Sequence, residues 1–345
     1  MRARTLGVIG TLVWDRFVDP TGRTEPIEGW GGISYALAAL SASLPGGWSI
    51  LPILKVGADL ADEGGRFLDK LPRIDTSALT VVPQANNRVE LRYESPASRS
   101  ERLAGGVPGW SSKELAAPIA ACDALYVNFI SGFEMDLETA REMSRAFPGS
   151  RYGDLHSLFL DLDATGRRIP RSLDDAWEWA RCFHAIQLNE DELALAAGGS
   201  DPWSRAAAEV VTGPSLIAVT LGPRGSACVA AAGFDADPFG WPGADSMDLA
   251  RQVAGRDGAG RQDLGREDAG RQDHGRQDVR TTTVPTEPRS GDPTGCGDVW
   301  GATFFARLLG GEGLRAAMTE ANRLAGLNVD HRAAAGLVTH FVEAQ

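Results

Sequence analysis

A glycine-rich turn near the C-terminus carries the residues with the clearest chemical potential. Residues 292–301 read DPTGCGDVWG and lead into an almost continuous apolar run, VWGATFFARLLGG. Backbone N–H groups at the start of a helix lack intrahelical partners, and glycines let a phosphate approach them closely. Asp298 would repel that phosphate, but it suits a site where it accepts the proton of an attacking alcohol. The segment therefore predicts phosphoryl transfer, with Asp298 as general base and the N–H groups of Gly295, Cys296 and Gly297 as an anion hole.

The spacing of this turn resembles the C-terminal signature of the PfkB, or ribokinase-like, family of carbohydrate kinases. That signature has the form D-T-x-G-A-G-D before an apolar helix, and Asp292 and Thr294 match its first residues. The resemblance places Thr294 among the residues that bind the nucleotide. Two departures occur, because Pro293 precedes Thr294 and Cys296 stands where alanine is usual. We expect the Cys296 side chain to point away from a phosphate held by the backbone.

Two N-terminal segments resemble the part of these kinases that holds the phosphate acceptor. GTLVWD places Asp15 shortly after the first apolar run, where the family holds sugar hydroxyls with an aspartate. GWGGISYALA supplies a glycine pair, Gly31 and Gly32, which the resemblance also assigns to the substrate. The asparagine that often follows is replaced within residues 34–36, which leaves the substrate class open. An alternative for Asp15 is a turn cap without a substrate contact.

Two further segments resemble the part of the family that holds the nucleotide and its metal ion. In NEDE, Asn189 and Glu192 have the N-x-x-E arrangement that organises Mg²⁺ through its waters, and Asn189 is also assigned to the nucleotide. In TLGPRG, Thr220, Gly222 and Gly225 have the T-x-G-x-x-G arrangement associated with nucleotide binding. NEDE taken alone is more typical of an exposed helix start, so the ordered set of motifs carries the prediction.

Polar side chains also follow two of the expected strands. Asn128 comes at the end of LYVNFI, and Asp154 and His156 come in GDLHS. Open α/β sheets bind ligands at the carboxyl ends of their strands, so we assign Asn128 to the substrate. His156 is equally compatible with a hydrogen-bonded structural histidine and with a substrate contact. Ser34 lacks the second glycine of a nucleophile elbow, which disfavours a hydrolase.

The pattern of apolar runs predicts an α/β fold. Short β-branched runs such as LGVIGTLV, WSILPILKVG and SLIAVTLG alternate with helix-like segments such as DLETAREMSRAF. This alternation predicts a mainly parallel sheet with helices on both faces. Residues 11–30 and 81–108 are more polar and contain the alternating RVELRY, which suits a small β lid. We therefore expect one ribokinase-like domain over residues 1–345.

Residues 255–280 form a tandem five-residue repeat with almost no apolar content, for example GRQDL followed by GREDA. A segment of this composition cannot bury a core, so we predict a disordered low-complexity insertion over residues 243–282. A calcium-binding repeat is disfavoured because the period is wrong and the arginines would repel a cation.

The overall composition excludes several classes of function. The chain has 345 residues and a formal net charge of −12, which disfavours binding to nucleic acid. Its 4 cysteines show no paired spacing, which is typical of reduced thiols and not of a disulfide framework. No apolar stretch is long enough to cross a membrane. We expect a cytoplasmic protein.

The combined prediction is an ATP-dependent kinase that phosphorylates a hydroxyl of a sugar or sugar-like molecule. The expected cofactors are ATP and Mg²⁺, and the resemblance also allows a monovalent cation and a homodimer. Two alternatives stay open: a nucleoside kinase of the same family, and a catalytically silent paralogue that senses a sugar. The intact GCGD at residues 295–298 argues against the silent paralogue.

Overall fold

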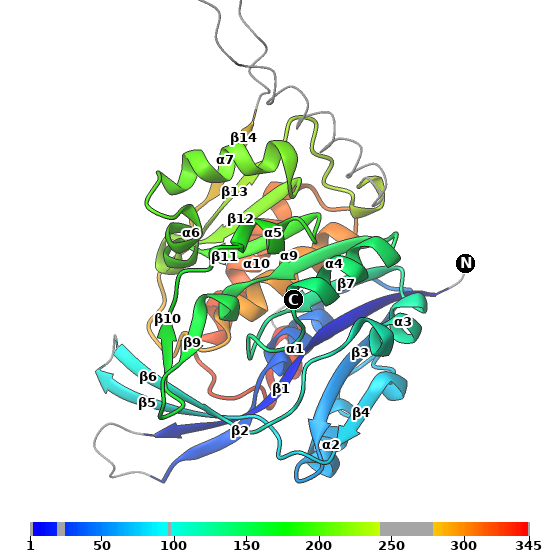
Figure 1. Ribbon diagram of the computed structural model, residues 1–345, viewed down its shortest axis with the longest axis vertical. Helices are drawn as coiled ribbons and strands as arrows, with labels where there is room; N and C mark the ends of the chain where they lie inside the picture. Colours follow the sequence, from blue (N-terminus) through cyan, green and yellow to red (C-terminus); the bar gives the residue numbers. More distant parts are fainter. Residues whose placement is uncertain (1–2, 19–24, 96–97, 242–278, 344–345) are drawn as a thin grey trace, which may run out of the picture.

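The computed structural model describes residues 3–18, 25–95, 98–241 and 279–343 and has an α/β architecture (Figure 1). Most of the predicted insertion, residues 243–282, lies outside these ranges. Its last residues belong instead to a strand, β14, whose β-branched TTT segment pairs with β13. The expected α/β class with a mainly parallel sheet is confirmed.

The strands of the main sheet follow the order β14-β13-β12-β11-β8-β7-β1-β3-β4. The pairs from β4 to β12 along this order are parallel, and β13 and β14 join antiparallel at one edge. Their bounds are β1 Arg4–Val18, β3 Trp48–Gly57, β4 Leu79–Val82, β7 Ala124–Asn128, β8 Ser150–Asp154, β11 Ala185–Asn189, β12 Leu216–Thr220, β13 Ser226–Ala230 and β14 Arg280–Val284.

Helices cover both faces of this sheet because successive strand residues point to opposite sides. One face packs on α1 (Ile33–Ser43), α2 (Ala61–Leu68), α9 (Cys296–Leu309), α10 (Leu314–Asn328) and α11 (Leu337–Glu343). The other face packs on α3 (Ser112–Ala120), α4 (Leu137–Ala146), α5 (Ala176–Ala180), α6 (Glu190–Ala197) and α7 (Pro202–Thr212). In β7, for example, Tyr126 belongs to the first core and Leu125 and Val127 belong to the second.

The strand β1 connects the main sheet to a smaller one. Its first half pairs with β3 and β7, and from Leu12 onward it pairs with β2 (Ile27–Gly32) and β5 (Arg88–Ser95). The strand β6 (Ser98–Ala104) extends this second sheet by pairing with β5. We refer to β2, β5, β6 and the second half of β1 as the lid sheet. The apolar run LGVIGTLV covers only residues 6–13, so this single strand of 15 residues extends beyond the run.

A hairpin formed by β9 (Leu160–Leu162) and β10 (Arg168–Pro170) lies against the lid sheet. The N–H of Leu103 in β6 donates to the Gly166 carbonyl in the hairpin turn at 2.9 Å. Figure 1 shows this hairpin reaching from the main sheet toward β5 and β6. None of the helices in the described ranges is long and apolar enough to span a lipid bilayer.

Candidate active site

A cavity of about 320 Å³ lies between the carboxyl ends of the central strands, the N-terminus of α9 and the lid sheet. This is the edge of an α/β sheet where ligands bind. The lining residues come from all three elements and from the β9–β10 hairpin. They are Val13, Asp15, Gly32, Tyr35, Val89, Leu91, Glu101, Ile130, Asp154, His156, Leu160, Arg168, Gln187, Asn189, Glu192, Thr220, Pro293, Thr294, Gly295, Gly297 and Asp298.

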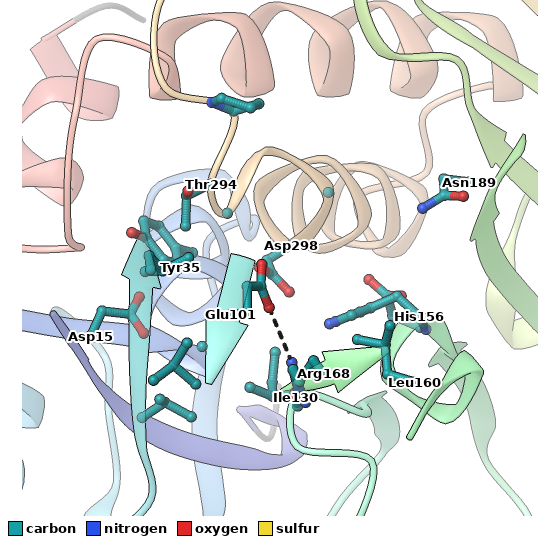
Figure 2. Close-up of a pocket in the computed structure, with 18 of the residues that line it drawn as sticks. Asp15, Tyr35, Glu101, Ile130, His156, Leu160, Arg168, Asn189, Thr294 and Asp298 are labelled. Atoms are coloured by element: carbon teal, nitrogen blue, oxygen red, sulfur yellow. Dashed lines mark hydrogen bonds and ion pairs between the residues drawn. The ribbon is translucent and has the colours of Figure 1, made fainter. Parts of the chain in front are cut away.

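Asp298 lies near the middle of this cavity, in the first turn of α9 (Figure 2). The Asn128 side-chain amide donates to the Asp298 carboxylate at 2.7 Å and thereby orients it. Burial and the Asp154 charge raise the pKa of Asp298 to about 6, although His156 and the Asn128 hydrogen bond act in the opposite direction. The carboxylate is therefore a stronger base than an exposed aspartate, yet it is ionised at neutral pH.

Asn128 itself is fully buried and is not among the lining residues. Its side-chain amide contacts Asp298, which does line the cavity, and the sequence-based assignment of Asn128 to the substrate stays a prediction.

The glycine turn brings backbone N–H groups to the cavity. Gly295 has φ of 77°, and a Cβ there would lie 2.4 Å from the Tyr35 ring, so only glycine fits. Gly295 and Gly297 line the cavity. The first-turn N–H groups of Gly297 and Asp298 have no intrahelical partner. The N–H of Cys296, which we expected in the anion hole, donates to the Pro293 carbonyl at 3.1 Å.

The Cys296 side chain points away from the cavity, as expected, and contacts the Ala325 carbonyl oxygen at 3.3 Å. Thr294 is held from both sides of the turn. Its N–H and hydroxyl donate to Asp292 at 3.0 and 2.6 Å, and its carbonyl accepts from Asn328 at 2.7 Å. Asp292 in turn accepts a short hydrogen bond from the Tyr93 hydroxyl in β5. The lid sheet is thus bonded directly to the glycine turn.

Asp15 and Tyr35 line the end of the cavity under the lid sheet (Figure 2). Asp15 is almost fully buried, and it lies within β1 and not in a turn, which disfavours the turn-cap alternative. A Cβ at Gly31 would lie 1.7 Å from Asp15 Oδ2, so Gly31 provides the space for this carboxylate. Gly31 does not line the cavity, whereas Gly32 does.

The same end holds an ion pair that the sequence did not indicate. Arg168 of the hairpin lies 3.7 Å from Glu101 of β6, as the dashed line in Figure 2 marks. The Arg168 guanidinium also donates to the carbonyls of Ile130 and Ser131 at 2.7 and 2.9 Å. Hydrogen-bonding side chains and the apolar Ile130 and Leu160 thus line the same cavity, which suits a polyhydroxylated ligand.

Asn189 and Glu192 form a capping box at the start of α6. Asn189 Oδ1 accepts from the Glu192 N–H at 2.9 Å, and Glu192 Oε2 accepts from the Asn189 N–H at 2.8 Å. Both residues also line the cavity, and Figure 2 shows Asn189 at the end away from Asp15. Burial raises the pKa of Glu192 to about 7, although His156 and the Asn189 N–H lower it. The helix-start alternative and a role in the site are therefore compatible.

Of the three residues assigned to the nucleotide in TLGPRG, Thr220 lines the cavity, whereas Gly222 and Gly225 do not. A Cβ at Gly225 would lie 2.2 Å from the Val284 carbonyl, so close packing against the end of β14 explains this glycine. The site role that the motif predicted for these two glycines stays a prediction.

Three strand ends place polar side chains side by side beneath α9. In the parallel register, Asn128 pairs with Asp154 and Asp154 pairs with Gln187. Gln187 donates to the Gly297 carbonyl at 2.9 Å, which fixes the glycine turn on the sheet. Sequence reasoning noted Asp154 and His156 as strand-end residues but did not assign them. Nothing in the sequence indicated Gln187 or Arg168.

Asp154, His156 and Asp298 each offer one ligand atom within 4.8 Å of the others, the geometry in which a metal ion could sit among the described residues. His156 Nδ1 lies 3.0 Å from Asp154 Oδ1. Burial lowers the pKa of His156, but Asp154, Asp298 and Glu192 together raise it to about 10. The two carboxylates beside the ring favour its protonated form, in which the imidazole has no lone pair for a metal ion.

Comparison with known proteins gives the fold. No protein-family model matches the chain, and no curated protein matches it. Solved structures do. A ribokinase from Cryptococcus neoformans in complex with ADP is 18% identical, with 99% of this chain and 100% of that chain covered and a TM-score of 0.62.

Two other structures widen the comparison. A nucleoside kinase from Burkholderia thailandensis in complex with inosine is 15% identical, with 99% and 97% coverage and a TM-score of 0.63. A pyrophosphate-dependent kinase in the ribokinase family, complexed with a pyrophosphate analogue and myo-inositol, is 14% identical, with 99% and 100% coverage and a TM-score of 0.66. The chain has the ribokinase fold over nearly its whole length.

Proposed function

We propose that this protein is an ATP-dependent kinase of the PfkB family that phosphorylates a hydroxyl of a sugar or sugar-like molecule. The proposal depends chiefly on one observation. A buried carboxylate, Asp298, faces the cavity from the first turn of α9, and Asn128 donates to it at 2.7 Å. A base that faces a phosphate-binding helix terminus is what transfer to an alcohol requires.

The reaction would be an in-line displacement at the terminal phosphorus of the donor. The acceptor oxygen forms a new P–O bond as its proton passes to Asp298. The P–O bond to the leaving group breaks, and ADP departs with the electron pair. Such transfer needs accurate positioning and charge stabilisation, and little covalent chemistry from the protein. The hydrogen bond from Asn128 keeps the Asp298 carboxylate in the orientation that can accept the proton.

Charge that develops on the transferred group would be stabilised by backbone N–H groups. Gly295 and Gly297 line the cavity, and α9 presents its N-terminus to it. Because the Cys296 N–H donates to Pro293, we assign this role to the N–H groups of Gly295 and Gly297.

The acceptor would bind between Asp15, Tyr35 and the Glu101–Arg168 pair. Asp15 is able to accept hydrogen bonds from two hydroxyls, and the lid sheet covers this end. Exclusion of water matters here because water is the competing phosphate acceptor.

The donor would lie toward Asn189 and Thr220, which line the opposite end. The Glu192 carboxylate already accepts from the Asn189 N–H, so it fits Mg²⁺ best through water. When bound, Mg²⁺ supplies neutralisation of the donor phosphates, and Asn189 and Glu192 would hold its waters.

The test is a screen of purified protein against sugars, polyols and nucleosides, with ATP and with inorganic pyrophosphate as donors. Release of ADP or phosphate is followed, and ³¹P NMR identifies the phosphate ester and the hydroxyl that carries it. We expect an ester with at least one sugar or polyol and ATP. If esters form only with nucleosides, the acceptor is a nucleoside and not a sugar. If they form only with pyrophosphate, the donor is pyrophosphate and not ATP. No ester with any pair would contradict the proposed activity.

A further inference from the structure

His156 occupies a special place in the cavity. It begins the short turn His156–Phe159 that directly follows β8, and it lines the cavity together with Asp298 (Figure 2). Its ring is fixed from behind, because Nδ1 lies 3.0 Å from Oδ1 of Asp154, a side chain that is only 2% exposed. The strand register places Asp154 between Asn128 and Gln187, whose side chains hold Asp298 and the Gly297 carbonyl. The His156 ring is therefore built into the same network as the base and the glycine turn.

The electrostatic surroundings of His156 favour its charged form. Asp154 and Asp298 flank the ring within 4.8 Å, and Glu192 of α6 also acts on it. Other charged residues that line the cavity are Asp15, Glu101 and Arg168. The terminal nitrogens of Arg168 pair with Glu101 and donate to two backbone carbonyls. Among the described lining residues, His156 is thus the cationic side chain next to Asp298.

The distances place this cation beside the reacting group. An acceptor oxygen that donates its proton to Asp298 must lie at hydrogen-bond distance from that carboxylate. The phosphorus under attack is then one bond length further, within the range of the His156 ring. Cationic donors aimed at a transferring phosphoryl group stabilise its charge in the transition state.

We propose that His156 is a second catalytic residue, whose Nε2–H donates to a non-bridging oxygen of the transferring phosphoryl group while Asp154 holds Nδ1–H and positions the ring. This assignment rests on the kinase activity proposed above. The ligand chemistry is a terminal phosphoryl group, which a nucleoside triphosphate and inorganic pyrophosphate share. No proton leaves His156 in this step, because the acceptor proton goes to Asp298.

The test compares His156→Gln, which keeps a polar side chain without the charge, with the matched control His340→Gln. His340 packs on His331 at 4.4 Å between ring centroids and does not line the cavity. We expect kcat to fall about 100-fold in His156→Gln, as for loss of one transition-state donor, with the acceptor KM changed less than about threefold. Asp154→Asn should lower kcat in the same direction, and the double variant should be no worse than His156→Gln alone.

A purely structural role of His156 predicts a different effect on stability and on kcat. Then His156→Gln would lower the melting temperature while kcat of the folded protein stayed at the parent value, and the assignment would be overturned. His156→Asn serves as a second neutral variant if the glutamine variant is poorly folded. Parent-like kcat in either folded variant refutes the proposal.

A binding measurement separates this inference from the proposed function. Calorimetry with inorganic tripolyphosphate requires no acceptor and no turnover. Suppose that the parent shows no kinase activity, so that the proposed function fails. The phosphoryl contact is still supported if His156→Gln binds tripolyphosphate at least about tenfold more weakly than both the parent and His340→Gln. In that case, equal tripolyphosphate affinities of the three proteins, or no binding to the parent, overturn the His156 assignment. If the parent is active and His156→Gln has parent-like kcat, the function stands and the His156 assignment falls.

Discussion

Gly31→Ala is expected to displace the Asp15 carboxylate by steric overlap, although Asp15 itself is unchanged. Asp15 lies opposite Gly29 in the β1–β2 register, so its side chain extends diagonally over Gly31. The new Cβ would lie 1.7 Å from Asp15 Oδ2 and 2.3 Å from its Cγ, so the carboxylate must rotate out of its place. Gly31 does not have a positive φ, so alanine is allowed by the backbone itself.

The size of the effect follows from the contact that is lost. A carboxylate that accepts from two acceptor hydroxyls in a closed site contributes about 2 to 4 kcal/mol. This corresponds to a roughly 30- to 1,000-fold loss of kcat/KM for the acceptor, while KM for ATP stays near the parent value. The strain of the displaced side chain should also cost stability, about 1 to 3 kcal/mol.

The assay is a double-mutant cycle of Gly31→Ala and Asp15→Ala, with kcat/KM for the acceptor measured for all four proteins. The control is Gly65→Ala in α2, where a Cβ meets nothing within 4 Å and where alanine favours the helix. We expect each single variant to lose activity toward the acceptor, and the double variant to be no worse than Asp15→Ala. An acceptor KM unchanged in Gly31→Ala, or two fully additive losses, would refute this explanation of the glycine.

Two other results are expected. Tyr93→Phe keeps the ring that lies under the Arg332 guanidinium but removes the hydrogen bond to Asp292, a bond to a charged group that contributes about 1.5 to 3 kcal/mol. We therefore expect kcat/KM for the acceptor and for the donor to fall together. Calorimetry that shows unchanged affinity for both would exclude this link between the lid sheet and the glycine turn. Because burial raises the pKa of Asp298 to about 6, the carboxylate takes up a proton as the pH falls. A plot of log kcat/KM against pH should therefore decline with a slope of about one below pH 6. A profile that stays flat down to pH 5 would contradict an ionised base of this pKa.

The sequence allowed the α/β class to be predicted because the signal is local. The apolar run LGVIGTLV lies in β1, SLIAVTLG contains β12, and the amphipathic DLETAREMSRAF contains α4. The extent of β1 was not predictable in the same way. Its second half carries the more polar WDRFV, which becomes a strand because β2 and β5 pair with it.

The site was predictable where the motif itself makes the contact. Asp298, Gly295 and Gly297 come to the cavity through a single turn and the helix that follows it. Asn128 was placed at the correct strand end, but its direction depends on α9, which is far away in the sequence. No local pattern could indicate that it bonds to Asp298.

A backbone hydrogen bond and an ion pair between distant parts of the sequence explain the remaining differences between the predicted and the observed site. The Cys296 N–H looked available in the motif, yet the turn closes on Pro293 and uses it. Arg168 comes from a short hairpin of 3-residue strands with no distinctive pattern, and it meets Glu101 only because that hairpin lies against β6. Such contacts are decided by tertiary packing and not by the type of residue.

The central claim, that Asp298 is the base in transfer to an alcohol, is tested most directly by the turnover of Asp298→Asn. Asparagine keeps the shape and can still contact Asn128, but it cannot accept the proton. With the best acceptor from the screen, we expect kcat to fall at least about 100-fold, the usual contribution of a general base, while calorimetry shows ATP bound at least as tightly as by the parent. The matched control is Asp201→Asn at the N-cap of α7, where asparagine also caps and activity should be unchanged. An Asp298→Asn protein that turns over at nearly the parent rate would contradict the claim.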